Sequence, residues 1–251
     1  MSWLSWGTTL VGGVIAFFYL GVPLLVRGSQ WLPAQYRFQP LPFDDYIGLQ
    51  TATHQQHVHL LRERGFDVVA FLSPTLMVDA AVTLLRHPVR HSLCSVTTLS
   101  NAQMVLDYVE LVRSWDSGAM LVMNNSTIPN PFPEDPARLQ CRLPATPPDQ
   151  LYDLFDMTER YLTRARGLTA REVTKDQVPE FVAHYLQQEA ERMTALGYFD
   201  APVQGRRQCT LKGACLMTWQ ALWPFKGWIA YRHRHAVNQL LALARADAGI
   251  P

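Results

Sequence analysis

The residues best suited to metal chemistry lie in one short segment, where His54, His57 and His59 form the motif HQQHVH. On a helix, His54 and His57 are three residues apart and share a face, whereas His59 points away from His54. Only two imidazoles could therefore bind one ion, and no cysteine lies nearby to complete a ligand set. We interpret these histidines as ordinary helix-face residues and keep a metal-dependent enzyme using His54 and His57 as an alternative.

Other reactive residue types lack the arrangement that catalysis needs. His87 and His91 flank the turn HPVRH, a spacing that suits a solvated turn. Asp107 and Glu110 alternate to opposite faces of a predicted strand, so they cannot act as a pair. The sequence contains no G-x-S-x-G motif, no glycine-rich phosphate loop and no CxxC pair. We therefore predict no catalytic residue and assign no cofactor.

The chain opens with a long uncharged segment. No charged side chain occurs between Ser2 and Val26, and residues 10–26 are almost wholly apolar. At about 1.5 Å per residue, such a stretch can span a hydrocarbon core of about 30 Å. The sequence therefore predicts one transmembrane helix over residues 3–26; a cleaved signal peptide is disfavoured because the basic n-region is missing. The predicted anchor and interface residues are Trp3, Trp6, Phe17, Phe18, Tyr19, Arg27 and Trp31.

Charges near this segment predict its orientation. Arg27 and Arg37 follow it, and no lysine or arginine precedes it. By the positive-inside rule we expect a single-pass membrane protein whose body is cytoplasmic. The predicted domains are a transmembrane anchor at 1–27, a linker at 28–43, an α+β body at 44–200 and a basic and aromatic helical segment at 201–251.

Short runs rich in Val, Leu and Thr occupy the first part of the body, with turn-forming residues between them. Runs of this length without room for intervening helices are typical of an antiparallel meander. The five predicted strands cover residues 66–72, 77–85, 93–99, 104–112 and 119–124. A proline-rich loop at 124–148 is expected to cover one edge of the sheet.

Helical patterns flank these strands. Apolar residues recur at spacings of three and four residues in segments 150–166 and 176–196, and a glycine ends each segment. Residues 46–64 form a further candidate helix. An amphipathic helix needs a surface for its apolar stripe. We therefore predict an α+β fold, in which a single transmembrane helix precedes a five-stranded antiparallel meander packed by C-terminal helices.

The C-terminal segment is basic and aromatic. Residues 201–246 contain seven basic residues and no Asp or Glu. Basic side chains beside tryptophan are typical of a helix lying in a bilayer interface. The alternatives are a packed core with solvated arginines, and a second span at 213–231 that a central Lys226 disfavours. The predicted membrane-surface residues are Lys212, Trp219, Trp223, Lys226, Trp228, Arg232 and Arg234.

Together these features favour a non-enzymatic function. We predict a single-pass accessory or assembly subunit of a larger membrane complex. Its expected partners are a lipid bilayer with anionic headgroups and an integral-membrane protein. One alternative is a module that binds lipid or another apolar ligand at the membrane surface, and the other is the metal-dependent enzyme. Nucleic acid is not an expected partner, because the basic segment carries no recognisable nucleic-acid-binding motif.

Overall fold

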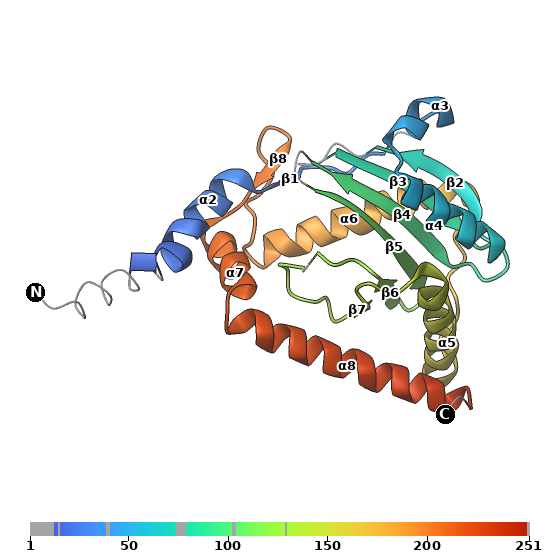
Figure 1. Cartoon of the computed structure of the whole chain (residues 1–251). Helices are drawn as coiled ribbons and strands as arrows, with labels where there is room; N and C mark the ends of the chain where they lie inside the picture. The colour runs from blue at the N-terminus through green and yellow to red at the C-terminus, as the bar shows by residue number, and fades with distance from the viewer. Residues whose placement is uncertain are drawn as a thin grey trace, which may run out of the picture. The chain divides into compact units, whose positions relative to one another are not determined.

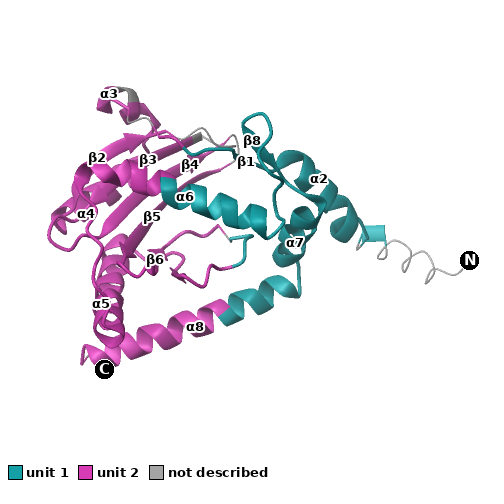
Figure 2. Ribbon diagram, turned by 180° about the vertical axis from the view of Figure 1, so that it is seen from behind, with its two compact units in different colours: residues 1–36, 129–133, 184–232 teal, residues 37–128, 134–183, 233–251 magenta. Residues whose placement is uncertain are grey.

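A computed structural model of the chain describes residues 13–14, 16–38, 41–73, 79–101, 104–128 and 130–249. The chain divides into two compact units, coloured separately in Figure 2. Unit 1 comprises Met1–Tyr36, Pro129–Pro133 and His184–Arg232. Unit 2 comprises Arg37–Ile128, Glu134–Ala183 and His233–Pro251.

A six-stranded sheet forms the centre of unit 2 (Figure 1). Its strands are β2 (Asp67–Leu72), β3 (Asp79–Arg86), β4 (Leu93–Ser100), β5 (Val105–Ser114), β6 (Met120–Asn124) and β7 (Arg138–Arg142). They lie in chain order, and neighbours are antiparallel except β6 and β7, which are parallel. Two successive parallel strands need a long connection, and residues 125–137 supply it.

Both faces of this sheet are apolar and covered within unit 2. On one face Val96, Val109 and Leu111 are buried in a large cluster. The helices that contribute to this cluster are α4 (Ala52–Glu63), α5 (Pro148–Arg166) and the second half of α8 (Phe225–Asp247). On the other face Leu84 packs with Val178, at the start of α6 (Val178–Ala195). The short elements α3 (Phe43–Tyr46), η2 (Ile47–Leu49) and η3 (Lys175–Gln177) join these parts.

Unit 1 is built around a small apolar cluster instead of a large sheet. Its own elements are η1 (Phe17–Gly21), α2 (Val22–Ser29), the antiparallel pair β1 (Trp31–Pro33) and β8 (Arg206–Gln208), and α7 (Leu211–Ala221). Met193, Tyr198 and Met217 are buried in the cluster, and Val26 of α2 packs against it. Gly213 permits a close approach of α7, because a Cβ there would lie 2.1 Å from the backbone oxygen of Tyr198.

The predicted transmembrane helix, with the single-pass membrane location that followed from it, is wrong. Across the part of the chain that the structure describes, no helix is both long enough and apolar enough to cross a bilayer. The described portion of this segment changes from π-helical bonding in η1 to α-helical bonding in α2, which ends at Ser29. Some of its apolar residues serve packing within unit 1, where Pro23 is buried and Val26 meets the apolar cluster. Trp3 and Trp6 lie outside the described residues.

The predicted fold class is also wrong about the sheet. β2 to β6 occupy the five segments predicted as strands, but β7 adds a sixth strand that is parallel to β6. β7 is only five residues long and lies within the segment predicted as a proline-rich loop. Its short sequence, RLQCR, alternates polar and apolar residues, but it contains no Val, Ile, Thr or aromatic residue and stands among prolines. The fold is therefore α+β with a mixed sheet covered on both faces.

Candidate functional site

In unit 1, an aromatic part of the chain is exposed to solvent. Every residue from 223 to 232 is exposed; we call these residues the aromatic stretch. The exposed fractions are 82% for Trp223, 61% for Trp228 and 65% for Tyr231. Within α8, Phe225, Trp228 and Ile229 share one side of the helix because they are three and four residues apart. A contiguous exposed apolar surface of this kind indicates a binding site.

A second exposed apolar surface lies on η1 and α2. Phe17 and Leu20 of η1 and Leu24 of α2 have exposed fractions of 56%, 68% and 60%; we call these three residues the leucine face. Pro23 is buried and Val26 packs against the apolar cluster of unit 1. This helical segment is therefore apolar on more than one side, and only one side is packed within the unit.

Two hydrogen bonds connect η1 to the end of α7 and the start of the aromatic stretch. The hydroxyl of Tyr19 donates to the backbone oxygen of Trp223 at 2.5 Å. The indole Nε1 of Trp219 donates to the backbone oxygen of Tyr19 at 3.2 Å. Helix α2 also packs against α7. The aromatic stretch and the leucine face therefore belong to one local structure within unit 1.

Charge is divided unevenly between the units. Unit 1 contains seven Lys or Arg and three Asp or Glu residues, a net charge of +4, which leaves −3 for unit 2. Lys226 and Arg232 lie in the aromatic stretch, and the guanidinium of Arg232 lies 6.0 Å from the ring centroid of Trp228. Both side chains are exposed, and neither residues 1–36 nor residues 201–232 contain an Asp or Glu. These two cations are thus available to an anionic partner.

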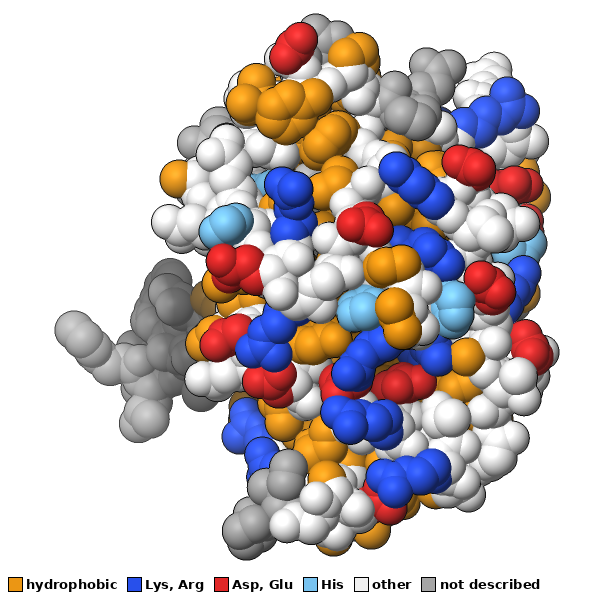
Figure 3. Space-filling model, turned by 90° about the vertical axis from the view of Figure 1, so that its right-hand side faces the viewer, with side chains coloured by type: hydrophobic (Ala, Val, Ile, Leu, Met, Phe, Trp, Pro, Cys, Tyr) orange, Lys and Arg blue, Asp and Glu red, His pale blue; other side chains and the backbone are white. Residues whose placement is uncertain are grey.

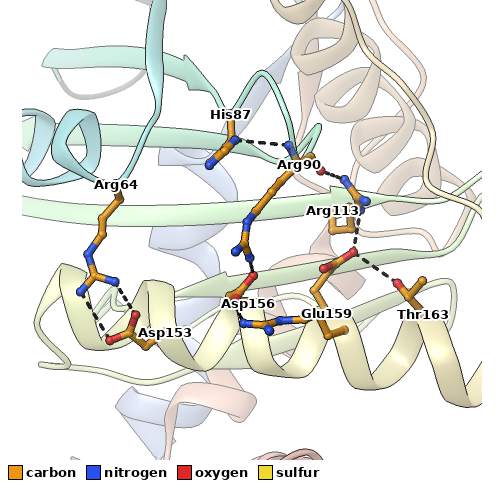
Figure 4. Close-up of polar contacts among 9 residues, drawn as sticks. Arg64, His87, Arg90, Arg113, Asp153, Asp156, Glu159 and Thr163 are labelled. Carbon is orange, nitrogen blue, oxygen red and sulfur yellow. Dashed lines mark hydrogen bonds and ion pairs between the residues drawn. The ribbon is translucent and has the colours of Figure 1, made fainter. Parts of the chain in front are cut away.

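Arginines of unit 2 are paired with carboxylates instead. Basic and acidic side chains intermingle on the face of the molecule shown in Figure 3. Arg64 lies 2.5 Å from a carboxylate oxygen of Asp153 on α5. Arg90 and Arg160 both form ion pairs with the nearly buried carboxylate of Asp156 (Figure 4). These charges neutralise one another, so we interpret this surface as structural.

The most buried ion pair of this network joins β5 to α5. Arg113 Nε lies 3.1 Å from Glu159 Oε1, and the two side chains are only 8% and 14% exposed (Figure 4). Arg113 also donates to the backbone oxygen of Arg90. Thr163 donates to Glu159 at 3.2 Å and accepts a hydrogen bond from Trp115 at 3.1 Å. This pair therefore ties the sheet, the turn after β3 and α5 together.

His54 occupies the middle of a buried hydrogen-bond chain. Its Nδ1 lies 2.9 Å from Thr98 Oγ1 and its Nε2 lies 2.8 Å from Thr83 Oγ1. Thr98 donates to Asp107 at 2.5 Å, so its oxygen accepts the proton of His54 Nδ1. His54 Nε2 then accepts from Thr83, whose oxygen lies 3.2 Å from the hydroxyl of Tyr46. This order assigns a neutral, structural imidazole with its proton on Nδ1.

The electrostatics agree with that assignment. Burial lowers the pKa of His54 to about 4 against the opposing charge of Asp107. Burial also raises the pKa of Tyr46 to about 12 and lowers the pKa of His57. Both ring nitrogens of His54 are occupied by threonines. Within the described ranges, no three His, Cys, Asp or Glu residues are placed to hold a metal ion, so the predicted site has no third ligand there.

We expect His54 to make unit 2 sensitive to acid. The folded pKa of about 4 lies below the reference value of 6.5, so the stability due to neutral His54 is complete above pH 6.5 and is lost as the pH falls through 4. The free energy of unfolding should fall by about 2.5 kcal/mol from this group between about pH 7.5 and about pH 4.5. Urea unfolding of His54→Gln should show a correspondingly smaller fall. His59→Gln, on the exposed side of α4, is the control and should behave as the unsubstituted chain does. Equal pH dependence in all three proteins would contradict the assignment.

The structure brings together most of the predicted membrane-surface residues. The exposed residues of unit 1 among them are Lys212, Trp219, Trp223, Lys226, Trp228 and Arg232. Lys212 lies away from the aromatic stretch along the chain and donates from Nζ to the backbone oxygen of Leu196 at 2.8 Å, beyond the end of α6. Arg234 is exposed but belongs to the part of α8 assigned to unit 2.

The predicted anchor residues are dispersed over three elements. Those that the structure describes are Phe17, Phe18 and Tyr19 in η1, Arg27 in the last turn of α2, and Trp31 in β1. The ring of Trp31 stacks under the guanidinium of Arg206 at 4.5 Å. Leu20 and Leu24 are exposed on η1 and α2, although the sequence pattern placed both in the interior of a transmembrane helix. Their charge-free, helical pattern was the available signal.

No protein-family model matches the chain, and no curated protein or solved structure is significantly similar to it. The class of site is therefore defined by its own chemistry. It is an exposed aromatic and cationic surface carried by two helical segments of unit 1.

Proposed function

We propose that the protein is a non-enzymatic protein that binds the surface of an anionic lipid bilayer through unit 1. The observation that carries the proposal is the exposure of every residue of the aromatic stretch, with Trp223, Trp228 and Tyr231 beside Lys226 and Arg232. Tryptophan and tyrosine rings favour the bilayer interface because one end is apolar and the other is polar. Lysine and arginine near an anionic surface each add about 1 kcal/mol of attraction.

The charge distribution supports an anionic partner. Unit 1 carries a net charge of +4, and neither residues 1–36 nor residues 201–232 contain an Asp or Glu. A headgroup phosphate near Lys226 or Arg232 therefore meets no nearby acidic residue of the same segment. Burial of each large apolar side chain contributes about 1.5–3 kcal/mol. A few such side chains are enough for reversible binding to a bilayer surface without a spanning helix.

Flotation with lipid vesicles tests the proposal. The intact chain should float with vesicles of phosphatidylcholine mixed with phosphatidylglycerol, and less of it should float with phosphatidylcholine alone. Raising the salt concentration from about 0.1 M to about 1 M shortens the Debye length from about 10 Å to about 3 Å, so the bound fraction should fall. A chain that stays with the free protein at every composition would overturn the proposal.

An accessory role beside an integral-membrane protein, binding of a separate apolar ligand, and metal-dependent catalysis all remain predictions.

A further inference from the structure

The two exposed surfaces of unit 1 differ in chemistry. The leucine face consists of Phe17, Leu20 and Leu24, whose side chains contain only carbon and hydrogen. The aromatic stretch contains indole and phenol groups together with Lys226 and Arg232. Hydrocarbon side chains favour the acyl region, whereas indoles, phenols and cations favour the headgroup region. If both surfaces contact one bilayer, their side chains should therefore settle at different depths.

The position of charge along α2 agrees with such a difference. The segment from Ser2 to Val26 has no charged side chain, and the first charge is the exposed Arg27 in the last turn of α2. An arginine at the end of an apolar segment can extend to phosphate groups while its stem stays in apolar surroundings. Leu24 lies about one turn before Arg27. The leucine face is thus followed within one helical turn by an exposed cation that can contact headgroup phosphates.

Two hydrogen bonds hold the segment that carries the leucine face beside the start of the aromatic stretch. Tyr19, which lies within η1, donates to the backbone oxygen of Trp223, and Trp219 donates back to the backbone oxygen of Tyr19. These bonds are made with backbone oxygens and therefore fix the chain positions of both segments. Val26 also anchors α2 to the apolar cluster of unit 1. A bilayer that binds the aromatic stretch is accordingly held close to the leucine face.

We infer that the leucine face is a second lipid-binding element, which inserts into the acyl region while the aromatic stretch remains among the headgroups. This inference rests on the proposed binding of unit 1 to an anionic lipid surface. It assigns Phe17, Leu20 and Leu24 to acyl-chain contact, and Arg27, Lys226 and Arg232 to phosphate contact. The inferred insertion is interfacial, since none of the described helices is long and apolar enough to cross a bilayer.

Spin labels at single positions measure the depth directly. The variants are Leu24→Cys for the leucine face, Ile229→Cys for the aromatic stretch and Leu243→Cys as the exposed control in unit 2. Each is made with Cys215→Ser, because the other three cysteines are buried. With phosphatidylcholine–phosphatidylglycerol vesicles, the label at 24 should be deeper than the label at 229, and the label at 243 should stay in water.

The outcomes separate the inference from the proposed function. A label at 24 that stays in water while the label at 229 enters the interface would overturn the inference alone. Water-exposed labels at both positions would overturn the proposed function as well. Labels at 24 that broaden one another without vesicles would show that a second copy covers the leucine face, and would also overturn the inference.

A binding measurement with uncharged substitutions provides an independent check. Leu24→Gln should weaken binding to the same vesicles about tenfold, because it removes one leucine side chain that the acyl region would bury. Leu243→Gln, which changes an equally exposed leucine of unit 2, should leave the affinity unchanged. Equal effects of the two substitutions would contradict the inference.

Discussion

Replacing both Trp223 and Trp228 with alanine is expected to weaken binding to anionic vesicles about 100-fold, because each lost ring removes about 1.5 kcal/mol of interfacial burial. The two side chains are 82% and 61% exposed, so neither supports the packing of the free protein. The hydrogen bond from Tyr19 uses the backbone oxygen of Trp223 and survives the substitution. Unfolding curves should therefore stay unchanged while vesicle affinity falls.

The matched control for this pair is Val89→Ala with Leu243→Ala. These residues are 79% and 55% exposed and lie in unit 2. Sedimentation of each double variant with sucrose-loaded anionic vesicles gives the two affinities. We expect a large loss of vesicle affinity for the tryptophan variant and little change for the control. Equal affinity of the tryptophan variant and the unsubstituted chain would show that the aromatic stretch does not bind lipid.

A large effect on stability is expected for Arg113→Met. This substitution leaves Glu159 nearly buried without its cation, and breaking a buried ion pair costs about 3 kcal/mol or more. Burial already lowers the pKa of Arg113, while the nearby charge of Glu159 opposes this effect. Urea unfolding should show a lower midpoint for the variant. The double variant Arg113→Met with Glu159→Met should recover much of the loss, because no unpaired charge remains.

Arg64→Met is the control for the buried pair. Arg64 also bonds a carboxylate of α5, but its side chain is 38% exposed and that of Asp153 is 61% exposed. A solvent-exposed pair contributes less than about 1 kcal/mol. Similar losses for Arg64→Met and Arg113→Met would contradict the view that burial decides the cost.

Local patterns in the sequence were enough to place five strands of the sheet. β3 and β4 are dense in Val, Leu and Thr, and turn residues bound them, so their positions follow from residue type and spacing. β7 could not be predicted in this way, because its strand character comes from pairing with β6 and not from its own composition. Which helices cover each face of the sheet could not be predicted either, because it depends on contacts between segments far apart in the chain.

The N-terminal error has a related physical cause. An apolar, uncharged segment has the same composition whether it spans a bilayer or packs partly against protein. Val26 lies in that segment, yet its neighbours in the apolar cluster of unit 1 come from residues far along the chain, such as Met217. Sequence spacing cannot supply such contacts.

The histidine network illustrates the same limit within unit 2. His54 is 29 residues from Thr83 and 44 residues from Thr98, the two side chains that occupy its nitrogens. Neither threonine belongs to a recognisable motif. The HQQHVH pattern therefore shows metal-capable residues but not the hydrogen bonds that determine their state. In the C-terminal segment, composition predicted the basic and aromatic character, while the exposure of residues 223–232 required the structure.

Hydroxyl-radical footprinting of the intact chain, with and without phosphatidylglycerol-containing vesicles, shows directly whether the aromatic stretch of unit 1 binds lipid. It reports the solvent access of individual side chains in the unaltered protein. If the aromatic stretch binds lipid, vesicles should protect Trp223, Trp228 and Tyr231 from oxidation, while Met104, an exposed residue of unit 2, is oxidised as before. Unchanged oxidation of the aromatic stretch, or protection of Met104 in its place, would contradict lipid binding by unit 1.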